Sequence, residues 1–215
     1  MKKIIISILV ICSCFILTGC NHKKVGGWEL DLKSNRASME EKELQIFNNT
    51  VNGKYEAVAL LGKQLVSGMN YMYLCRNDKE YKVIVIYNDL ENKATITSEK
   101  TFDITKYVFE KNTPEQTDLV GGWKVTPPQR KTTFDKEIRE SFETAQKELE
   151  DIEYYPAVLL GKQLVSGTNY AILSYGVPDD KYDSASVYVI TLYKDLKGNE
   201  EIVGYAYVDL TEYAK

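Results

Sequence analysis

The sequence is poor in the residues that most catalytic and metal sites need. Its 215 residues include a single histidine, His22, which lies next to the N-terminal apolar segment. A Ser-His or Cys-His catalytic pair and a histidine-based zinc site each need histidine from a folded part. No Gly-rich loop of the kind that cradles phosphates occurs either. We therefore predict that the protein is not an enzyme and holds no cofactor and no metal.

Cysteine is also scarce. Of the four cysteines, Cys12 and Cys14 lie in the N-terminal apolar segment, Cys20 follows it, and only Cys75 remains in the rest of the chain. A single cysteine leaves no partner for an intrachain disulfide. Because its neighbours are apolar and β-prone, Cys75 is interpreted as a small core residue, with a reactive thiol as the alternative.

An excess of positive charge is missing too. The chain carries 27 Lys and Arg residues against 31 Asp and Glu residues, and no stretch forms a basic face. Proteins that bind nucleic acid rely on such a face. We therefore predict no nucleic-acid partner.

No apolar run is long enough for an ordinary membrane-spanning helix. Residues 4–16 form an apolar run of 13 residues, whereas a spanning helix needs about 20. Lys2 and Lys3 precede this run, and positive charge followed by a short apolar core is typical of a signal peptide.

The residues that follow, Leu17-Thr18-Gly19-Cys20, resemble the lipobox of bacterial lipoproteins. The resemblance implies cleavage before Cys20, acylation of Cys20 with diacylglycerol and palmitate-like chains, and anchoring to the extracytoplasmic side of the cell membrane. Two acyl chains anchor a protein far more firmly than one. Residues 1–19 would be the signal peptide and 20–24 the lipidated tether. The alternative is a plain secretory signal that ends near Gly19.

The rest of the chain contains a tandem repeat. Four pairs of segments recur in the same order: residues 25–28 with 120–123, 60–68 with 159–167, 70–71 with 169–170, and 87–90 with 193–196. The repeat is about 100 residues long, the size of a small domain and too long for a solenoid unit. We predict domain 1 over residues 25–110, a linker over 111–118 and domain 2 over 119–215.

Each copy begins with a predicted helix. Copy two has apolar residues at helical spacing, namely Phe134, Ile138, Phe142, Ala145, Leu149 and Ile152. In copy one, Ser38 and Glu41 have the spacing of a capping box. Between the tryptophan and the repeated hairpin motif, copy two is four residues longer, which predicts a helix about one turn longer.

A strand meander follows each helix. We predict strands over residues 55–65, 69–75, 81–87 and 94–102 in copy one, and over 186–193 and 202–207 in copy two, all from β-prone sequence. One helix followed by a meander predicts an α+β fold, with the helix packed on one face of an antiparallel sheet.

The hairpin motif carries a family resemblance. Gln64-Leu65-Val66-Ser67-Gly68 is followed by Asn70-Tyr71, and Gln163-Leu164-Val165-Ser166-Gly167 by Thr168-Asn169-Tyr170. This pattern resembles the cystatin superfamily, and its disulfide-free branch, the stefins, in particular. The resemblance implies two cystatin-like domains, each an antiparallel sheet of four to five strands wrapped on one helix. It also implies reversible inhibition of papain-like cysteine proteases.

In that family, inhibition uses a wedge made of an N-terminal glycine, a first hairpin and a second hairpin tip. Carried over to this sequence, the wedge would comprise Gly27, Gln64, Leu65, Val66, Ser67, Gly68 and Leu90 in copy one. In copy two it would comprise Gly122, Gln163, Leu164, Val165, Ser166, Gly167, Leu196 and Gly198.

Other interpretations remain open. Gly68 and Gly167 can simply supply positive φ in a tight turn, although turn chemistry does not explain Leu-Val at the hairpin shoulder. An inhibitor predicts an exposed apolar wedge. A non-inhibitory module that binds another surface or secreted protein predicts exposed aromatic residues on a sheet face or between the copies. A structural spacer predicts no exposed patch.

Overall fold

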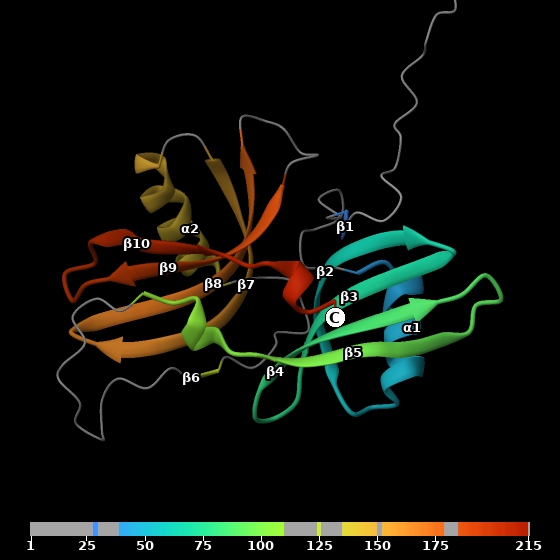
Figure 1. Cartoon of the computed structure of the whole chain (residues 1–215). Helices are drawn as coiled ribbons and strands as arrows, with labels where there is room; N and C mark the ends of the chain where they lie inside the picture. Colours follow the sequence, from blue (N-terminus) through green and yellow to red (C-terminus); the bar gives the residue numbers. More distant parts are fainter. Residues whose placement is uncertain are drawn as a thin grey trace, which may run out of the picture.

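The computed structural model describes residues 28–29, 39–109, 124–125, 135–149, 152–178 and 185–214, and this part of the chain is mostly β-sheet (Figure 1). Two antiparallel sheets have the strand orders β1-β2-β3-β4-β5 and β10-β9-β8-β7-β6. In each sheet four long strands form a meander, and a two-residue strand lies at one edge.

The first repeat contains the first sheet and one helix. Its elements are β1 (Trp28–Glu29), α1 (Glu41–Val51), β2 (Glu56–Val66), β3 (Gly68–Arg76), β4 (Tyr81–Asn88), β5 (Ala94–Phe102) and the 3₁₀ helix η1 (Ile104–Lys106).

The second repeat has the same order of elements. They are β6 (Lys124–Val125), α2 (Lys136–Ala145), the 3₁₀ helix η2 (Gln146–Glu148), β7 (Ile152–Val165), β8 (Gly167–Pro178), β9 (Ser186–Lys194), β10 (Glu200–Tyr207) and the 3₁₀ helix η4 (Leu210–Glu212).

Local sequence explains where the helices begin and end. The backbone N–H of Glu40 donates to the Glu43 carboxylate at 2.9 Å, which closes a capping box at the start of α1. The cap therefore lies two residues beyond Ser38, which falls outside the described residues. In the second repeat α2 has 10 residues, one fewer than α1, and η2 adds three more, so the helical segment is two residues longer rather than the predicted full turn. Ile152, which we placed on the helical stripe, begins β7 instead.

The predicted strands are confirmed closely, but the predicted fold class is wrong. We expected two cystatin-like domains, each with a sheet wrapped on one helix. The described part of the chain is instead mostly sheet, and its α-helices span only 11 and 10 residues. The helices lie on one face of their sheets, as expected. The other faces of the two sheets pack against each other.

The larger core lies between the two sheets. It joins side chains from both repeats in one cluster that includes Ala59, Leu61, Met72, Leu74, Val83 and Val85 of the first sheet and Leu160, Ala171, Leu173, Val187 and Val189 of the second. Phe47 of α1 and Phe142 of α2 pack on the outer faces. The order of layers is therefore helix, sheet, sheet, helix.

The sequence of β4 shows why the predicted fold class was wrong. Residues 83–86 read Val-Ile-Val-Ile, and all four side chains are buried. Val83 and Val85 face the second sheet, whereas Ile84 and Ile86 face α1. An uninterrupted apolar run of this kind is typical of a strand that is buried on both faces. Our prediction placed a helix on one face of each sheet and gave the other face no partner.

The end of each repeat crosses to the other repeat. The phenol oxygens of Tyr107 and Tyr213 lie 2.8 Å apart in the shared core. Ser98 of β5 donates to the Tyr213 carbonyl at 2.7 Å, and the Phe109 N–H donates to the Thr191 hydroxyl of β9 at 3.0 Å. These reciprocal contacts bind the repeats into one body.

Both crossing segments share a sequence pattern, Asp-x-Thr-x-Tyr, over residues 103–107 and 209–213. Each aspartate accepts hydrogen bonds from the backbone and hydroxyl of the threonine two residues later. Our sequence analysis missed this fifth repeated segment.

Several predictions about the N-terminus fall outside the described residues: the signal peptide 1–19, Cys20 and the tether 20–24. The linker 111–118 does so as well. Within the described ranges no helix combines the length and apolar character needed to cross a bilayer.

Candidate functional site

The two turns of each repeat form a tip at one end of its sheet. We call residues 65–67 together with Leu90 the repeat 1 tip, and residues 164–166 together with Leu196 the repeat 2 tip. The turns lie side by side because β3 pairs with β4, with Met69 opposite Asn88, and β8 pairs with β9, with Thr168 opposite Lys194.

A tyrosine ties the two turns of each tip together. The hydroxyl of Tyr87 donates to the Ser67 carbonyl at 2.6 Å, and the hydroxyl of Tyr193 donates to the Ser166 carbonyl at 2.5 Å. The repeated tyrosine therefore fastens the first turn to the strand that leads into the second turn.

The motif glycines allow this close approach. Gly68 has φ +139° and Gly167 has φ +125°, values that L side chains rarely adopt. A Cβ at these positions would lie 2.6 Å from the Asn88 carbonyl oxygen and 2.4 Å from that of Lys194. The structural explanation that we left open therefore holds for both glycines.

The motif glutamines also have a structural role. Asn70 donates to the Gln64 side-chain oxygen at 2.7 Å, and Asn169 donates to that of Gln163 at 2.7 Å. Gln163 is completely buried. The pairs bridge β2 to β3 and β7 to β8, so both glutamines hold the register of their hairpins.

An aspartate organises the second turn of each tip. The Asp195 carboxylate accepts from the backbone N–H groups of Lys197 and Asn199, both at 2.8 Å, and from the Asn199 side chain. The hydrogen bond from the Asn199 side chain has the largest effect, and together these bonds hold the pKa of Asp195 below its ordinary value. Asp89 makes the equivalent backbone bonds in repeat 1.

Gly198, which we predicted as a contact residue, is exposed at the left-handed position of this turn with φ +89°. Asn92 occupies the same position in repeat 1 with φ +63°. Gly198 therefore shapes the turn, and an asparagine can replace it.

The turns expose leucines among polar and charged side chains such as Glu91 and Lys197. Leu90 is 82% exposed, Leu196 84% and Leu164 67%. Leu65, Val66 and Val165 are half-buried, and Ser67 and Ser166 are exposed. Because these leucine side chains are mostly exposed, they bury little apolar surface within the fold. Exposed leucines on a rigid turn are suited to contact with another surface.

The two tips lie at opposite ends of the molecule, with the repeat 1 tip on the right of Figure 1 and the repeat 2 tip on the left. Trp28 of β1 pairs with Gln64, so β1 lies beside the end of β2 that leads into the repeat 1 tip. The predicted wedge residues Gly27 and Gly122 lie outside the described residues.

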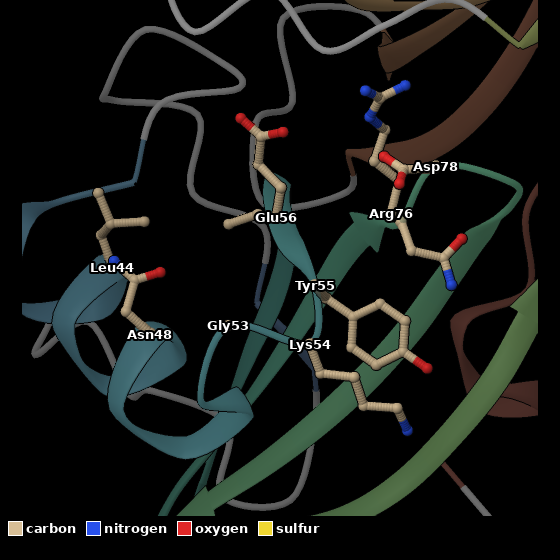
Figure 2. A pocket seen from close by; sticks show the side chains of 10 residues that line it. Leu44, Asn48, Gly53, Lys54, Tyr55, Glu56, Arg76 and Asp78 are labelled. Atoms are coloured by element: carbon tan, nitrogen blue, oxygen red, sulfur yellow. The ribbon is translucent and has the colours of Figure 1, made fainter.

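A groove of about 710 Å³ lies at the other end of the β2–β3 hairpin, between α1 and the start of β2 (Figure 2). Its lining includes Lys54, Tyr55, Glu56 and Arg76. Figure 2 shows Arg76 and Glu56 pointing away from Lys54 and Tyr55, so the charged groups do not converge on one ligand position.

A second exposed surface was missed by our sequence analysis. Tyr205 and Tyr207 of β10 are 53% and 56% exposed on the outer face of the second sheet. They pack against Tyr154 and Tyr188, with ring centroids 5.9 Å apart for each pair. Burial raises the pKa of Tyr154 to about 12. The available signal was the Tyr-x-Tyr spacing, which places both rings on one face of a strand.

Within the described ranges no three His, Cys, Asp or Glu side chains come together as a metal site. Cys75 is buried, and burial raises the pKa of its thiol, which agrees with our interpretation of a core residue. Compared with models of known protein families and with curated proteins, the sequence matches neither a family nor an individual protein.

Proposed function

We propose that this chain is a membrane-anchored, non-catalytic binding protein that grips a partner reversibly with its hairpin tips. The observation that supports this most directly is the pair of exposed leucines, Leu164 and Leu196, on two turns that are fastened to each other. The partner class that we propose is a papain-like cysteine protease, because the hairpin motif resembles that of a family of such inhibitors.

The rigidity of the tips suits this role. Each turn is held by backbone bonds, an aspartate and a tyrosine, so that little conformational entropy is lost when it docks. Burial of one leucine side chain contributes about 1.5–3 kcal/mol. A tip that fills a protease cleft blocks substrate without any nucleophile or base of its own.

A second candidate function is favoured by the exposed tyrosines. Tyr205 and Tyr207 give the second sheet an aromatic outer face, and tyrosine is enriched at protein interfaces. This observation favours a non-inhibitory module that binds another surface or secreted protein through the sheet face.

The experiment is a titration of papain with residues 21–215, following hydrolysis of a peptide substrate. We expect inhibition by the wild-type chain. The variant Leu164→Asp/Leu196→Asp should weaken inhibition by about a hundredfold or more. It removes two leucines that the complex would bury and places charge in the interface. Leu65→Asp/Leu90→Asp tests the repeat 1 tip in the same way.

The matched control is Leu44→Asp, which alters an exposed leucine on α1 away from both tips. It should inhibit as the wild type does. Equal inhibition by the wild type and by a chain altered at both tips would show that the tips are not the contact. Absence of inhibition at micromolar protein would exclude the papain-like class. If the wild-type chain captures a surface protein and the variant Tyr205→Ser/Tyr207→Ser does not, the second candidate is supported.

A further inference from the structure

The two tips are alike in structure but differ in their distance from the proposed lipid anchor. Trp28 pairs with Gln64, two residues before Val66, so the first described strand runs next to the repeat 1 tip. Trp28 lies eight positions after Cys20. Even fully extended, that length of chain reaches only about 28 Å.

The repeat 2 tip lies at the opposite end of the molecule (Figure 1). The strands that lead to the tips are long, since β2 has 11 residues and β7 has 14, and each residue adds about 3.3 Å. The tether is therefore too short to bring the far end of the molecule to the bilayer as readily as the near end.

We infer that the repeat 1 tip lies against the lipid surface, whereas the repeat 2 tip points away from the membrane and is the one that meets a soluble partner. The first half of this inference rests on the proposed anchor at Cys20, and only the second half rests on the proposed binding function. The occupant of the repeat 1 tip is the interfacial region of the bilayer.

The repeat 1 tip presents apolar side chains to that occupant, beside the exposed Glu91 and Lys93. Leu90 is the most exposed apolar residue of this tip, and Leu65 and Val66 lie half-exposed in the adjacent turn. Apolar side chains held close to the bilayer by a lipid anchor add to the binding, because each one buries further apolar surface in the interface.

Two equivalent leucines allow a matched test. Leu90→Cys and Leu196→Cys place a thiol at the same position of the two tips, and both leucines are more than four-fifths exposed. Cys75 is buried and its thiol pKa is raised, so the new cysteine is the one that a dye labels. Mass spectrometry of the full chain, purified from bacterial membranes, establishes whether Cys20 is acylated.

The labelled, lipidated chain is placed in phosphatidylcholine–phosphatidylglycerol vesicles that carry an energy acceptor on the lipid headgroups. We expect energy transfer from the dye on the Leu90→Cys variant to be at least about threefold higher than from the dye on the Leu196→Cys variant, because the tether limits only repeat 1 to the bilayer surface. Equal transfer from the two variants overturns the inference, as does a Cys20 without acyl chains.

A further variant distinguishes a repeat 1 tip that contacts the bilayer from one that lies near the bilayer only because the tether is short. A dye on Glu91→Cys should lose transfer when Leu90→Asp is added, because a charged tip leaves the interface. Unchanged transfer in that double variant overturns docking of the tip. No protein partner is present in these measurements, so a failure of the proposed protease binding leaves their outcome unaffected.

Discussion

Equivalent positions of the two repeats, on the outer faces of their sheets, carry a charged network in repeat 1 and packed tyrosine rings in repeat 2. Tyr55 and Tyr154 occupy equivalent positions, next to β2 and in β7. In repeat 1 the Tyr55 hydroxyl donates to the Glu99 carboxylate at 2.6 Å, and Lys54 pairs with the same carboxylate at 3.0 Å. In repeat 2 the ring of Tyr154 packs edge-on against Tyr188 at 5.3 Å.

The strand registers identify the exchanged residues. Lys82 pairs with Thr101 across β4 and β5, and Tyr188 pairs with Tyr207 across β9 and β10. Glu99 likewise corresponds to Tyr205, since both lie two residues earlier on the last strand of their sheet. One backbone therefore supports either a polar network or a cluster of tyrosines.

The tips, by contrast, are preserved in both repeats. The tyrosine-to-carbonyl bond, the glutamine–asparagine pair and the aspartate turn recur at equivalent positions. The difference teaches that backbone geometry constrains the tips, whereas the outer sheet face accepts two different sets of side chains on the same strand pairing. The following predictions test this contrast.

The largest effect is expected from the motif glycines. Gly68→Ala and Gly167→Ala should each lower the free energy of unfolding by about 3 kcal/mol or more, because the added Cβ meets a backbone carbonyl and the φ value is unfavourable. Chemical denaturation measures the loss.

The control for this prediction is Gly198→Ala, where φ is positive but no atom of the described residues lies within 4 Å of the added Cβ. We expect a loss of only about 1 kcal/mol from backbone strain. If Gly167→Ala costs no more than Gly198→Ala, the close approach of the two hairpins is not what requires glycine.

A smaller effect is expected where the repeats meet. Tyr107→Phe and Tyr213→Phe should each cost about 1–2 kcal/mol, because each leaves the other hydroxyl in the core without its 2.8 Å partner. The double variant should cost clearly less than the sum of the two, since both changes remove one shared interaction. A double-mutant cycle from urea unfolding checks this, and additive losses would contradict it.

The smallest effect concerns the outer face of repeat 1. The hydrogen bond from the Tyr55 hydroxyl, and to a smaller extent the one from Lys54, holds the pKa of Glu99 below its ordinary value of 4.5. A carboxylate with a lowered folded pKa stabilises the fold above the ordinary value, and this contribution is lost as the pH falls through the folded pKa. Glu99→Gln should cost about 1 kcal/mol or less at neutral pH.

The stability difference between the wild type and Glu99→Gln should therefore shrink as the pH falls below about 4.5. Tyr205→Phe is the matched control in repeat 2, where no carboxylate occupies the position, and its effect should stay constant over about pH 3 to 7. A difference for Glu99→Gln that does not change with pH would show that the carboxylate adds no pH-dependent stability.

Sequence reasoning was most successful where interactions are local. Strand positions followed from runs of β-prone residues, as with residues 94–102, which match β5. Repeat spacing correctly indicated more helical residues in repeat 2, but it overestimated the gain, since α2 and η2 together exceed α1 by two residues. The roles of Gln163 and Gly167 were harder to assign, because the atoms that explain them belong to Asn169 and to Lys194 on a different strand.

The sequence by itself determined the tandem repeat, the order of helix and strands in each copy, and the apolar residues at the hairpin shoulders, because each depends on residues that are neighbours along the chain. Only the tertiary structure decided that the sheets bury both faces, that the Tyr107–Tyr213 pair joins the repeats, and that the tips lie at opposite ends. These features depend on which apolar face meets which, and an apolar side chain carries no record of the partner against which it will be buried.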